Sequence, residues 1–328
     1  MRRIKGMAIG LLLTLSACMP WDEEKVDPEK AQAPAVSRLT IALGQGGANY
    51  SAGNAVCVAL KKSGSTLPCK LLASNGSQQN ILAMADKQVD LALVRADSAY
   101  QAWHGQKPFV KRNPKLRVLF SLHHEALTLL VKENAQIFSF KQIHNGAIHM
   151  GLDDSRNSGL ILGLLDQCEI PLTNSLSNQE SGSLAKLLEQ EAVQGGLTIL
   201  SHPDEQIKAL ANQMALQLLP VNGLCVERLV DESPFLDRMD IPGGLYQGLA
   251  SSIPSFGAKV WLMASTDLPD SVVYEVVKAA FEGVEQFRRS DPAFYHLSPR
   301  KMLSPFVIPY HVGAVHYFQE KGWYTETR

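Results

Sequence analysis

The sequence predicts a mixed α/β fold in which two lobes face each other across a ligand-binding cleft. Short apolar runs that end in glycine-rich or polar turns alternate with segments of helical spacing, which is the pattern of strands followed by helices. This alternation starts twice along the 328 residues, so the chain is long enough for two α/β units and a C-terminal remainder. Because a strand–helix–strand order favours parallel pairing, parallel-rich sheets with helices on both faces are expected.

The first half of the chain is expected to hold three strand–helix pairs. The strands are predicted at residues 39–43, 70–73 and 90–94. The helices that follow them are predicted at residues 50–61, 78–86 and 97–103, in the same order. Two further strands are predicted at residues 117–122 and 127–131. The second of these lies where the first lobe passes into the second.

The second half is expected to repeat the pattern and then return. Its strands are predicted at residues 147–152, 197–200, 216–219 and 259–263, and its helices at residues 158–165, 184–192, 204–212 and 270–288. Residues 38–125 and 245–328 are therefore assigned to lobe 1, and residues 126–244 to lobe 2. Because ligands of open α/β sheets bind beyond the carboxyl ends of strands, the loops that follow the strands form the candidate site.

Residues 1–18 are predicted to be a lipoprotein signal peptide that ends in a lipid-modified cysteine. A basic start precedes an apolar run at residues 7–15, which is too short to span a bilayer. The run ends in Leu15-Ser16-Ala17-Cys18, which resembles the bacterial lipobox. Acylation of Cys18 would anchor the protein to a membrane. The alternative is an ordinary secretory signal with a chance cysteine.

Composition favours a globular domain on a flexible tether. Residues 19–37 hold three prolines, many charges and little apolar content, as linkers do. Without the three basic residues of the signal, 28 basic residues face 32 acidic ones, a net charge of −4. No basic patch suggests nucleic acid, and no later segment has eighteen uninterrupted apolar residues, so a transmembrane helix is not expected.

The four remaining cysteines favour disulfide bonds, because an even number in an exported chain is typical of them. Three pairings are open. Cys57 and Cys69 are close in sequence, and each falls at the edge of a predicted element, so this pair is favoured. Cys168–Cys225 follows only by elimination. No spacing of cysteine and histidine is typical of zinc.

Two first-lobe loops combine glycine with polar residues directly after a strand. The first contains Gly46, Gly47 and Tyr50, and the start of the next helix would present backbone amides to an anion. The second contains Gly76 and Ser77. A plain strand–helix turn is the alternative for the first loop, and a helix N-cap at Ser77 is the alternative for the second.

The third strand ends in Arg95, which is followed by Asp97. An arginine at a strand exit suits a ligand carboxylate, but it could equally pair with Asp97 or another internal acid. In the second lobe, the loop at residues 151–159 contains Ser155 and Ser158 and leads into a helix. His202 ends a strand and could line the cleft, although a structural role is the commoner one for a lone histidine.

The motifs of common catalytic chemistries are missing from the sequence. It contains no HExxH, no GxSxG and no Walker motif. His123, His124 and Glu125 form a tempting cluster, but alternate side chains of a strand face opposite ways, so the three cannot easily converge on a metal. No enzyme activity, metal or cofactor is therefore expected.

Several segments together resemble the TAXI class, the TRAP-associated extracytoplasmic immunogenic solute receptors. The similar segments, in order, are residues 39–50 (LTIALGQGGANY), Gly76-Ser77 with Asn80, residues 90–100 (DLALVRADSAY), Ser158-Gly159, residues 242–246 (PGGLY) and residues 309–314 (PYHVGA). The resemblance covers about residues 38–324. Departures from the class pattern are Arg95, Leu245, Val312 and the charges at Asp153, Asp154 and Arg156, and they bear on the identity of the ligand.

This resemblance implies a periplasmic, hinged receptor with the type II-like periplasmic binding protein fold. Such a monomer would capture a small anionic metabolite, a dicarboxylate or an amino acid such as glutamate or 2-oxoglutarate, and deliver it to a TRAP-type permease. The implied ligand contacts add Asn80, Asp97 and, near the hinge, Tyr246 to the loop residues above. A lipoprotein ligand sensor uncoupled from transport and an extracytoplasmic enzyme that kept the fold are the alternatives.

Overall fold

The computed structural model describes residues 36–44, 47–145, 147–149, 158–171, 184–303 and 307–324. The predicted signal peptide, the predicted lipidation site at Cys18 and nearly all of the predicted tether lie outside these ranges. Three strand–helix pairs open the described chain, as the sequence predicts. They are β1 (Leu39–Ala42) and α1 (Gly47–Lys62), β2 (Cys69–Leu72) and α2 (Ser77–Ala85), and β3 (Leu91–Arg95) and α3 (Ala96–His104). β1 lies between β2 and β3 and is parallel to both.

β4 (Leu116–Lys132) is one continuous strand of 17 residues, although the sequence predicts two. The polar run at residues 123–125 suggested a break between them. Instead the irregularity is absorbed by register shifts against β9, between Val118 and Phe120 and between Ser121 and His124. Such bulges bend a strand without ending its hydrogen bonding to the neighbouring strand. β4 therefore pairs with β9 in the first lobe and continues into the second lobe, where it pairs with β6 and β7.

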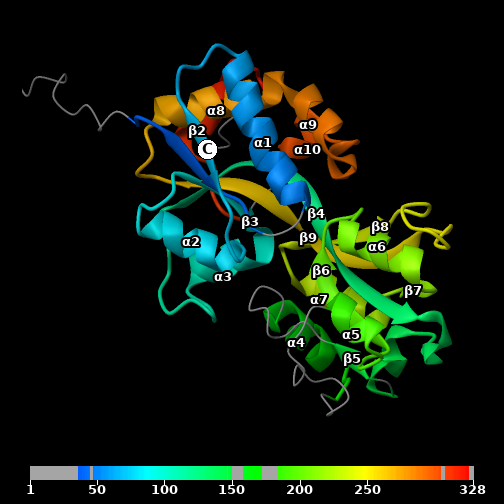
Figure 1. Ribbon diagram of the computed structural model, residues 1–328. Helices are drawn as coiled ribbons and strands as arrows, with labels where there is room; N and C mark the ends of the chain where they lie inside the picture. The colour runs from blue at the N-terminus through cyan, green and yellow to red at the C-terminus, as the bar shows by residue number, and fades with distance from the viewer. Residues whose placement is uncertain are drawn as a thin grey trace, which may run out of the picture. The chain divides into compact units, whose positions relative to one another are not determined.

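β9 (Ile253–Ser265) is the return strand, and it is longer than the predicted segment at residues 259–263. Its second half pairs with β3 and β4, and its first half pairs with β8 (Leu236–Ile241). The two crossing strands approach closely at Gly257, where an added Cβ would lie 2.1 Å from the Glu125 carbonyl oxygen. Figure 1 shows β4 and β9 running together from the β1–β3 region to the β6–β8 region.

Four strands form the sheet of the second lobe, namely β5 (Ile148–His149), β6 (Gly195–Leu200), β7 (Leu216–Leu219) and β8. Its helices are α4 (Ser158–Gln167), α5 (Leu184–Glu189), α6 (Glu205–Gln213) and α7 (Leu224–Glu232). β5 and β6 are parallel, whereas β6 and β7 run antiparallel to β4. The sequence did not predict α7 or β8. The strand order is β2-β1-β3-β9-β4-β6-β5, with β7 added to β4 and β8 added to β9. The fold class is therefore α/β, as expected, with antiparallel pairs wherever β4 and β9 take part.

Helices complete the first lobe after β9. The predicted helix at residues 270–288 is divided at Gly283 into α8 (Asp270–Glu282) and α9 (Val284–Ser290). A Cβ added at Gly283 would lie 3.1 Å from the Cβ of Ala59 on α1, so the backbone passes close to α1 there. They are followed by η4 (Pro292–Phe294), α10 (Pro299–Met302) and α11 (Val312–Glu320). Two short 3₁₀ turns, η1 (Glu133–Ala135) and η2 (Phe140–Asn145), follow β4. Among the helices of the described residues, none is both long and apolar enough to cross a membrane.

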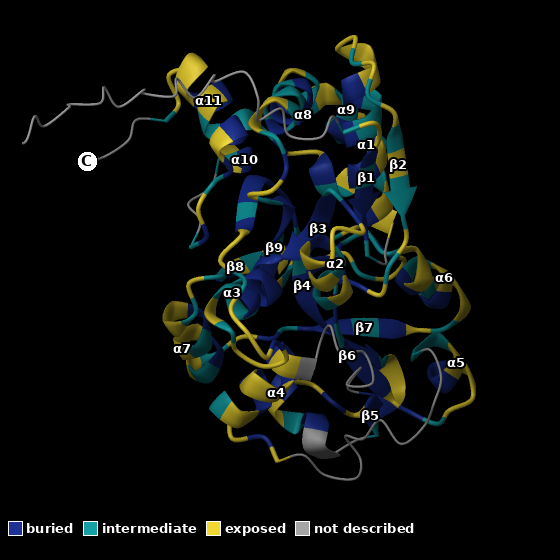
Figure 2. Cartoon of the chain, turned by 90° about the vertical axis from the view of Figure 1, so that its left-hand side faces the viewer, coloured by how far each residue is buried: buried dark blue, intermediate teal, exposed yellow. Residues whose placement is uncertain are grey.

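Three hydrophobic clusters form the core, and Figure 2 shows their buried residues along the strands and on the covered faces of the helices. One cluster belongs to the first lobe, one to the second, and the third contains residues of both. Tyr246 packs in the second-lobe cluster, with Leu245 and Leu249 against it. Ile253 also packs against this cluster, and the boundary between the lobes stays a prediction.

Both expected disulfides are present. Cys57–Cys69 joins α1 to β2, and Cys168–Cys225 joins the end of α4 to α7. The cysteines of these pairs are 12 and 57 residues apart. A cross-link that closes a longer loop removes more conformational entropy from the unfolded chain.

Replacing Cys168 and Cys225 together by serine is expected to lower the free energy of unfolding by about 3–4 kcal/mol. The matched change of Cys57 and Cys69 should lower it less, by about 2–3 kcal/mol, because the loop it opens is shorter. Urea unfolding of the two double variants beside the unmodified protein measures both losses. An equal or larger loss for the short loop would contradict the expectation.

Candidate ligand-binding site

The carboxyl ends of β1 and β2 lie side by side and begin the site. Gly44 and Gly76 both have positive φ angles, of 94° and 112°, which favour glycine. A Cβ at Gly44 would lie 3.6 Å from the Cα of Gly76. Because α1, α2 and α3 all start just after these strands and β3, the N-termini of three helices, the positive ends of their dipoles, lie at this end of the sheet.

Arg95 is buried at the end of β3, with 3% of its surface exposed. Its Nε and Nη2 donate to the two carboxylate oxygens of Asp97 at 2.7 and 2.8 Å. Burial opposes the charge of the guanidinium, but Asp97 and, to a smaller extent, Glu125 outweigh it and raise the pKa of Arg95 above its usual value. Of the two roles that the sequence left open, the internal ion pair is the one present in the structure.

Glu125 and Asn49 also belong to this network, although the sequence analysis did not select them. The Oε2 atom of Glu125 lies 3.5 Å from Nη1 of Arg95, and its Oε1 accepts from Nδ2 of Asn49 at 3.1 Å. Asn49 stands in the first turn of α1, whereas Glu125 stands on β4 just before it reaches β6. The network therefore connects a crossing strand to the first ligand loop.

The side chains of this network carry an excess of negative charge, because one guanidinium faces two carboxylates. A ligand carboxylate that bound Arg95 would compete with Asp97 for the same donors. The positive potential that remains for an anion comes from the helix N-termini. Direct contact between Arg95 or Asp97 and a solute therefore stays a prediction.

Ser77 and Asn80 hold the end of β3 in place. Ser77 Oγ accepts from the backbone N–H of Arg95 at 2.9 Å, and the N-cap of α2 is Gly76, so Ser77 is not the cap. Asn80 is completely buried and donates from Nδ2 to the Leu93 carbonyl at 2.7 Å. Gly47 starts α1 and is exposed, as is Tyr50, with 61% of its surface accessible. Gly46 lies outside the described residues.

His202 and Tyr246 meet in the second lobe, in a chain of partly buried hydrogen bonds. Nδ1 of His202 lies 2.6 Å from the Tyr246 hydroxyl, and Nε2 lies 2.9 Å from Thr128 Oγ1. The Tyr246 oxygen accepts from the Asp204 N–H at 2.8 Å, and the Thr128 hydroxyl donates to the Ala126 carbonyl at 3.1 Å. The sequence connected neither Thr128 nor Asp204 with these two residues.

The positions of the protons in this chain of hydrogen bonds follow from the groups at its two ends, Thr128 and Tyr246. Thr128 donates to a carbonyl, so it accepts from Nε2–H of His202, and Nδ1 of His202 accepts from the Tyr246 hydroxyl. Burial lowers the pKa of His202 to about 4, in agreement with this neutral tautomer, and burial raises the pKa of Tyr246 above its usual value. Every donor and acceptor of His202 is thus used within the protein, which favours its structural role.

The start of α4 lies beside the first lobe. A Cβ added at Gly159 would lie 3.5 Å from Nε2 of Gln101 on α3. The rings of Tyr100, also on α3, and Phe235, between α7 and β8, lie 5.0 Å apart. Ser158 is the first residue of α4, and Ser155 falls outside the described residues. The helix start predicted to contact the solute from the second lobe is therefore next to α3.

The side chains of residues 123–125 diverge, as the strand geometry predicts. His123 is buried against Phe294, at 5.3 Å between ring centroids, and neither of its ring nitrogens has a hydrogen-bond partner. Nε2 of His124 lies 3.2 Å from Asp237, while Glu125 faces Asn49. Across the ranges that the structure describes, no three His, Cys, Asp or Glu side chains are grouped as metal ligands are.

Residues 41–322 match the model of the NMT1-like family. The chain belongs to the NMT1-like family. Among the solved structures with a similar course of the chain is the periplasmic aliphatic sulphonate binding protein SsuA from Escherichia coli. The two sequences are 12% identical, the match covers 87% of this chain and 90% of that chain, and the TM-score is 0.44. A TctC solute binding protein from Polaromonas has 12% identity, with 88% and 97% covered and a TM-score of 0.45.

A third such structure is XAC2383 from Xanthomonas citri bound to ATP. It has 11% identity, covers 81% of this chain and 93% of its own, and has a TM-score of 0.47. Similarities at this level leave the solute of this NMT1-like protein to be inferred from its own residues.

Proposed function

We propose that this NMT1-like protein is an extracytoplasmic solute receptor that captures a small anionic metabolite and delivers it to a TRAP-type permease. The observation that carries the proposal is the meeting of three helix N-termini at the ends of β1, β2 and β3, around a buried polar network. Backbone amides at helix starts bind anions without a dedicated cation. Membership of the NMT1-like family and the resemblance to the TAXI class support the same role.

In this proposal the anionic group of the solute binds the amides at the starts of α1 and α2, near Gly47 and Gly76. The exposed Tyr50 ring covers it, and the start of α4, at Ser158, closes on it from the second lobe. Arg95, Asp97, Ser77 and Asn80 act mainly by holding the loops in position, through the hydrogen bonds described above. A dicarboxylate or an acidic amino acid fits such a site.

Lobe motion is proposed to occur where β4 and β9 cross, at Glu125 and Gly257. The lobes are then residues 36–125 with 258–324 and residues 126–257, which places Tyr246 in the second lobe. A solute that contacts both lobes would select the closed form. The protein would act in the periplasm as a monomer, tethered by a lipid on Cys18, with no cofactor and no catalytic step.

The test is a thermal-shift screen of the purified protein against dicarboxylates, amino acids, sugars and sulfonates. A solute at about a thousand times its Kd should stabilise the protein by about 4 kcal/mol and raise Tm by several degrees. Tyr50→Ala should reduce the shift. Phe138→Ala, which removes an aromatic ring of comparable exposure (70%) in the second lobe, should leave it unchanged.

The pattern of shifts distinguishes the competing roles. Shifts confined to anionic compounds would support the proposal. Shifts with neutral sugars alone, or equal effects of the two variants, would overturn the assigned site. If an anion binds but the permease takes up no solute in proteoliposomes with the loaded receptor, the sensor role replaces the transport role.

A further inference from the structure

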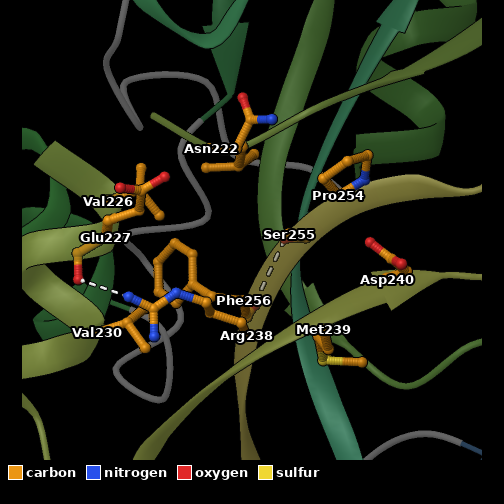
Figure 3. A pocket seen from close by; sticks show the side chains of 11 residues that line it. Asn222, Val226, Glu227, Val230, Arg238, Met239, Asp240, Pro254, Ser255 and Phe256 are labelled. Atoms are coloured by element: carbon orange, nitrogen blue, oxygen red, sulfur yellow. Dashed lines mark hydrogen bonds between the residues drawn. The ribbon is translucent and has the colours of Figure 1, made fainter. Parts of the chain in front are cut away.

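A cavity of about 380 Å³ lies between α7 and the β8–β9 pair, apart from the ends of β1, β2 and β3. Figure 3 shows the side chains that line it, which we call the α7 pocket. Its volume is within the range of small-molecule sites, which begins at about 300 Å³. A compact organic molecule would therefore fit into this space.

The floor of the α7 pocket is apolar. It is formed by four buried side chains from three parts of the chain, namely Val221, Val226, Val230 and Phe256. These side chains are only 0–6% exposed, so an occupant would contact them just where they open onto the cavity. An occupant with an apolar body would match the character of this floor.

The rim of the pocket is acidic. Arg238 is already paired with Asp231 at 2.6 Å and reaches the Glu227 carbonyl at 3.4 Å. The carboxylates of Glu227 and Asp240 form no ion pair with another side chain of the described residues. Figure 3 shows them on opposite sides of the pocket. Because the one cation is matched by Asp231, two uncompensated carboxylates face an occupant.

The pocket borders the segment by which the chain returns to the first lobe. Pro254, Ser255 and Phe256 line it and directly precede Gly257. On its other side, α7 is fixed to α4 by the Cys168–Cys225 disulfide. An occupant would thus contact α7 and the crossing strand at once, and it would restrain their relative movement.

We propose that the α7 pocket binds a small amphipathic organic cation. Its apolar body packs on Val226, Val230 and Phe256, and its ammonium group lies between Glu227 and Asp240. This site is separate from the proposed solute site and does not depend on the transport role.

The experiment uses three probes that differ mainly in charge: phenethylammonium, 2-phenylethanol and phenylacetate. Binding to the purified protein is followed by ligand-observed NMR up to about 10 mM, the range in which small fragments bind. Phenethylammonium is expected to bind most tightly and phenylacetate least. Amide exchange in residues 224–232 and 253–257 should slow when phenethylammonium is bound.

Two variants test the assignment of the groups. Glu227→Gln with Asp240→Asn should weaken phenethylammonium about threefold or more, since each partly exposed charge pair contributes modestly, and should bring it close to 2-phenylethanol. Val230→Trp should abolish binding of all three probes by filling the pocket. Asp231→Asn, with Arg238→Gln to keep the charge balanced, is the matched control and should retain the preference for the cation.

Three outcomes would overturn the proposal. They are no binding of phenethylammonium, equal affinity in the unmodified protein and in the Glu227/Asp240 double variant, and a preference for phenylacetate. Because the double variant changes only exposed side chains, its fold is expected to be kept, and the result does not depend on whether Val230→Trp folds.

Discussion

Acidification from pH 6.5 to pH 4 is expected to remove about 6 kcal/mol of stability through two buried histidines. Burial, with a smaller effect of His124, lowers the pKa of His123 to about 3, and burial lowers that of His202 to about 4. Both have a reference pKa of 6.5. Below pH 6.5 the unfolded chain therefore binds two protons that the folded protein does not bind, and stability falls by about 2.7 kcal/mol per pH unit.

This loss is comparable to the whole stability of an ordinary domain, about 5–15 kcal/mol. The measurement is the free energy of unfolding in urea at a series of pH values. His123→Leu should flatten the slope by about 1.4 kcal/mol per pH unit. It should not reduce stability at pH 7, because both ring nitrogens of His123 are buried without a partner.

His316→Gln is the matched control, since His316 is exposed on α11. This variant removes a histidine from the surface and leaves His123 and His202 in place, so it should keep the slope of the unmodified protein. A His123→Leu variant with the slope of the unmodified protein would mean that His123 is accessible to protons in the folded state.

Arg95→Leu is expected to lower the free energy of unfolding by about 3–5 kcal/mol at pH 7. The change leaves Asp97 and Glu125 without the guanidinium that balances them, in a site where Arg95 and Asp97 are 3% and 4% exposed. Arg95→Lys keeps the charge but loses the two parallel hydrogen bonds to Asp97, so an intermediate loss is expected. Asp97→Asn with Glu125→Gln should restore part of the stability of Arg95→Leu.

Arg238→Leu provides the comparison, because it removes an exposed ion pair with Asp231 and should cost at most about 1 kcal/mol. The Arg95 variants should also be tested for solute binding in the thermal-shift screen. A small loss of stability with a large loss of solute affinity would return Arg95 to the role of a direct ligand group. A large loss of stability with affinity retained in Arg95→Lys would confirm the positioning role.

The first-lobe elements could be predicted to within a few residues because each strand is a short apolar run closed by glycine or a polar turn. β4 was misjudged because three polar residues in a row look like a break, whereas the bulges against β9 accommodate them. The division of α8 from α9 falls at Gly283, a glycine inside the predicted helix at residues 270–288, and glycine weakens a helix locally. β8 was missed because four of its six residues remain at least partly accessible and its apolar signal is weak.

The candidate site shows the same difference between local and distant contacts. Arg95 and Asp97 are two residues apart, so their ion pair could be foreseen as one of two options. Asn49 and Glu125 are 76 residues apart, and their contact depends on where β4 passes the start of α1. The chain from Tyr246 through His202 to Thr128 likewise joins three distant segments, each of which has an ordinary sequence.

The connectivity of the two disulfides has a consequence for biogenesis. Cys57 pairs with Cys69 and Cys168 with Cys225, so each bond joins neighbours in the order of the cysteines along the described residues. In a chain exported from its N-terminus, the first pair emerges complete before either member of the second. An oxidant that joins thiols in order of appearance then makes the native bonds directly, without thiol–disulfide exchange to correct them. Acylation of Cys18 would remove the one earlier thiol that could compete.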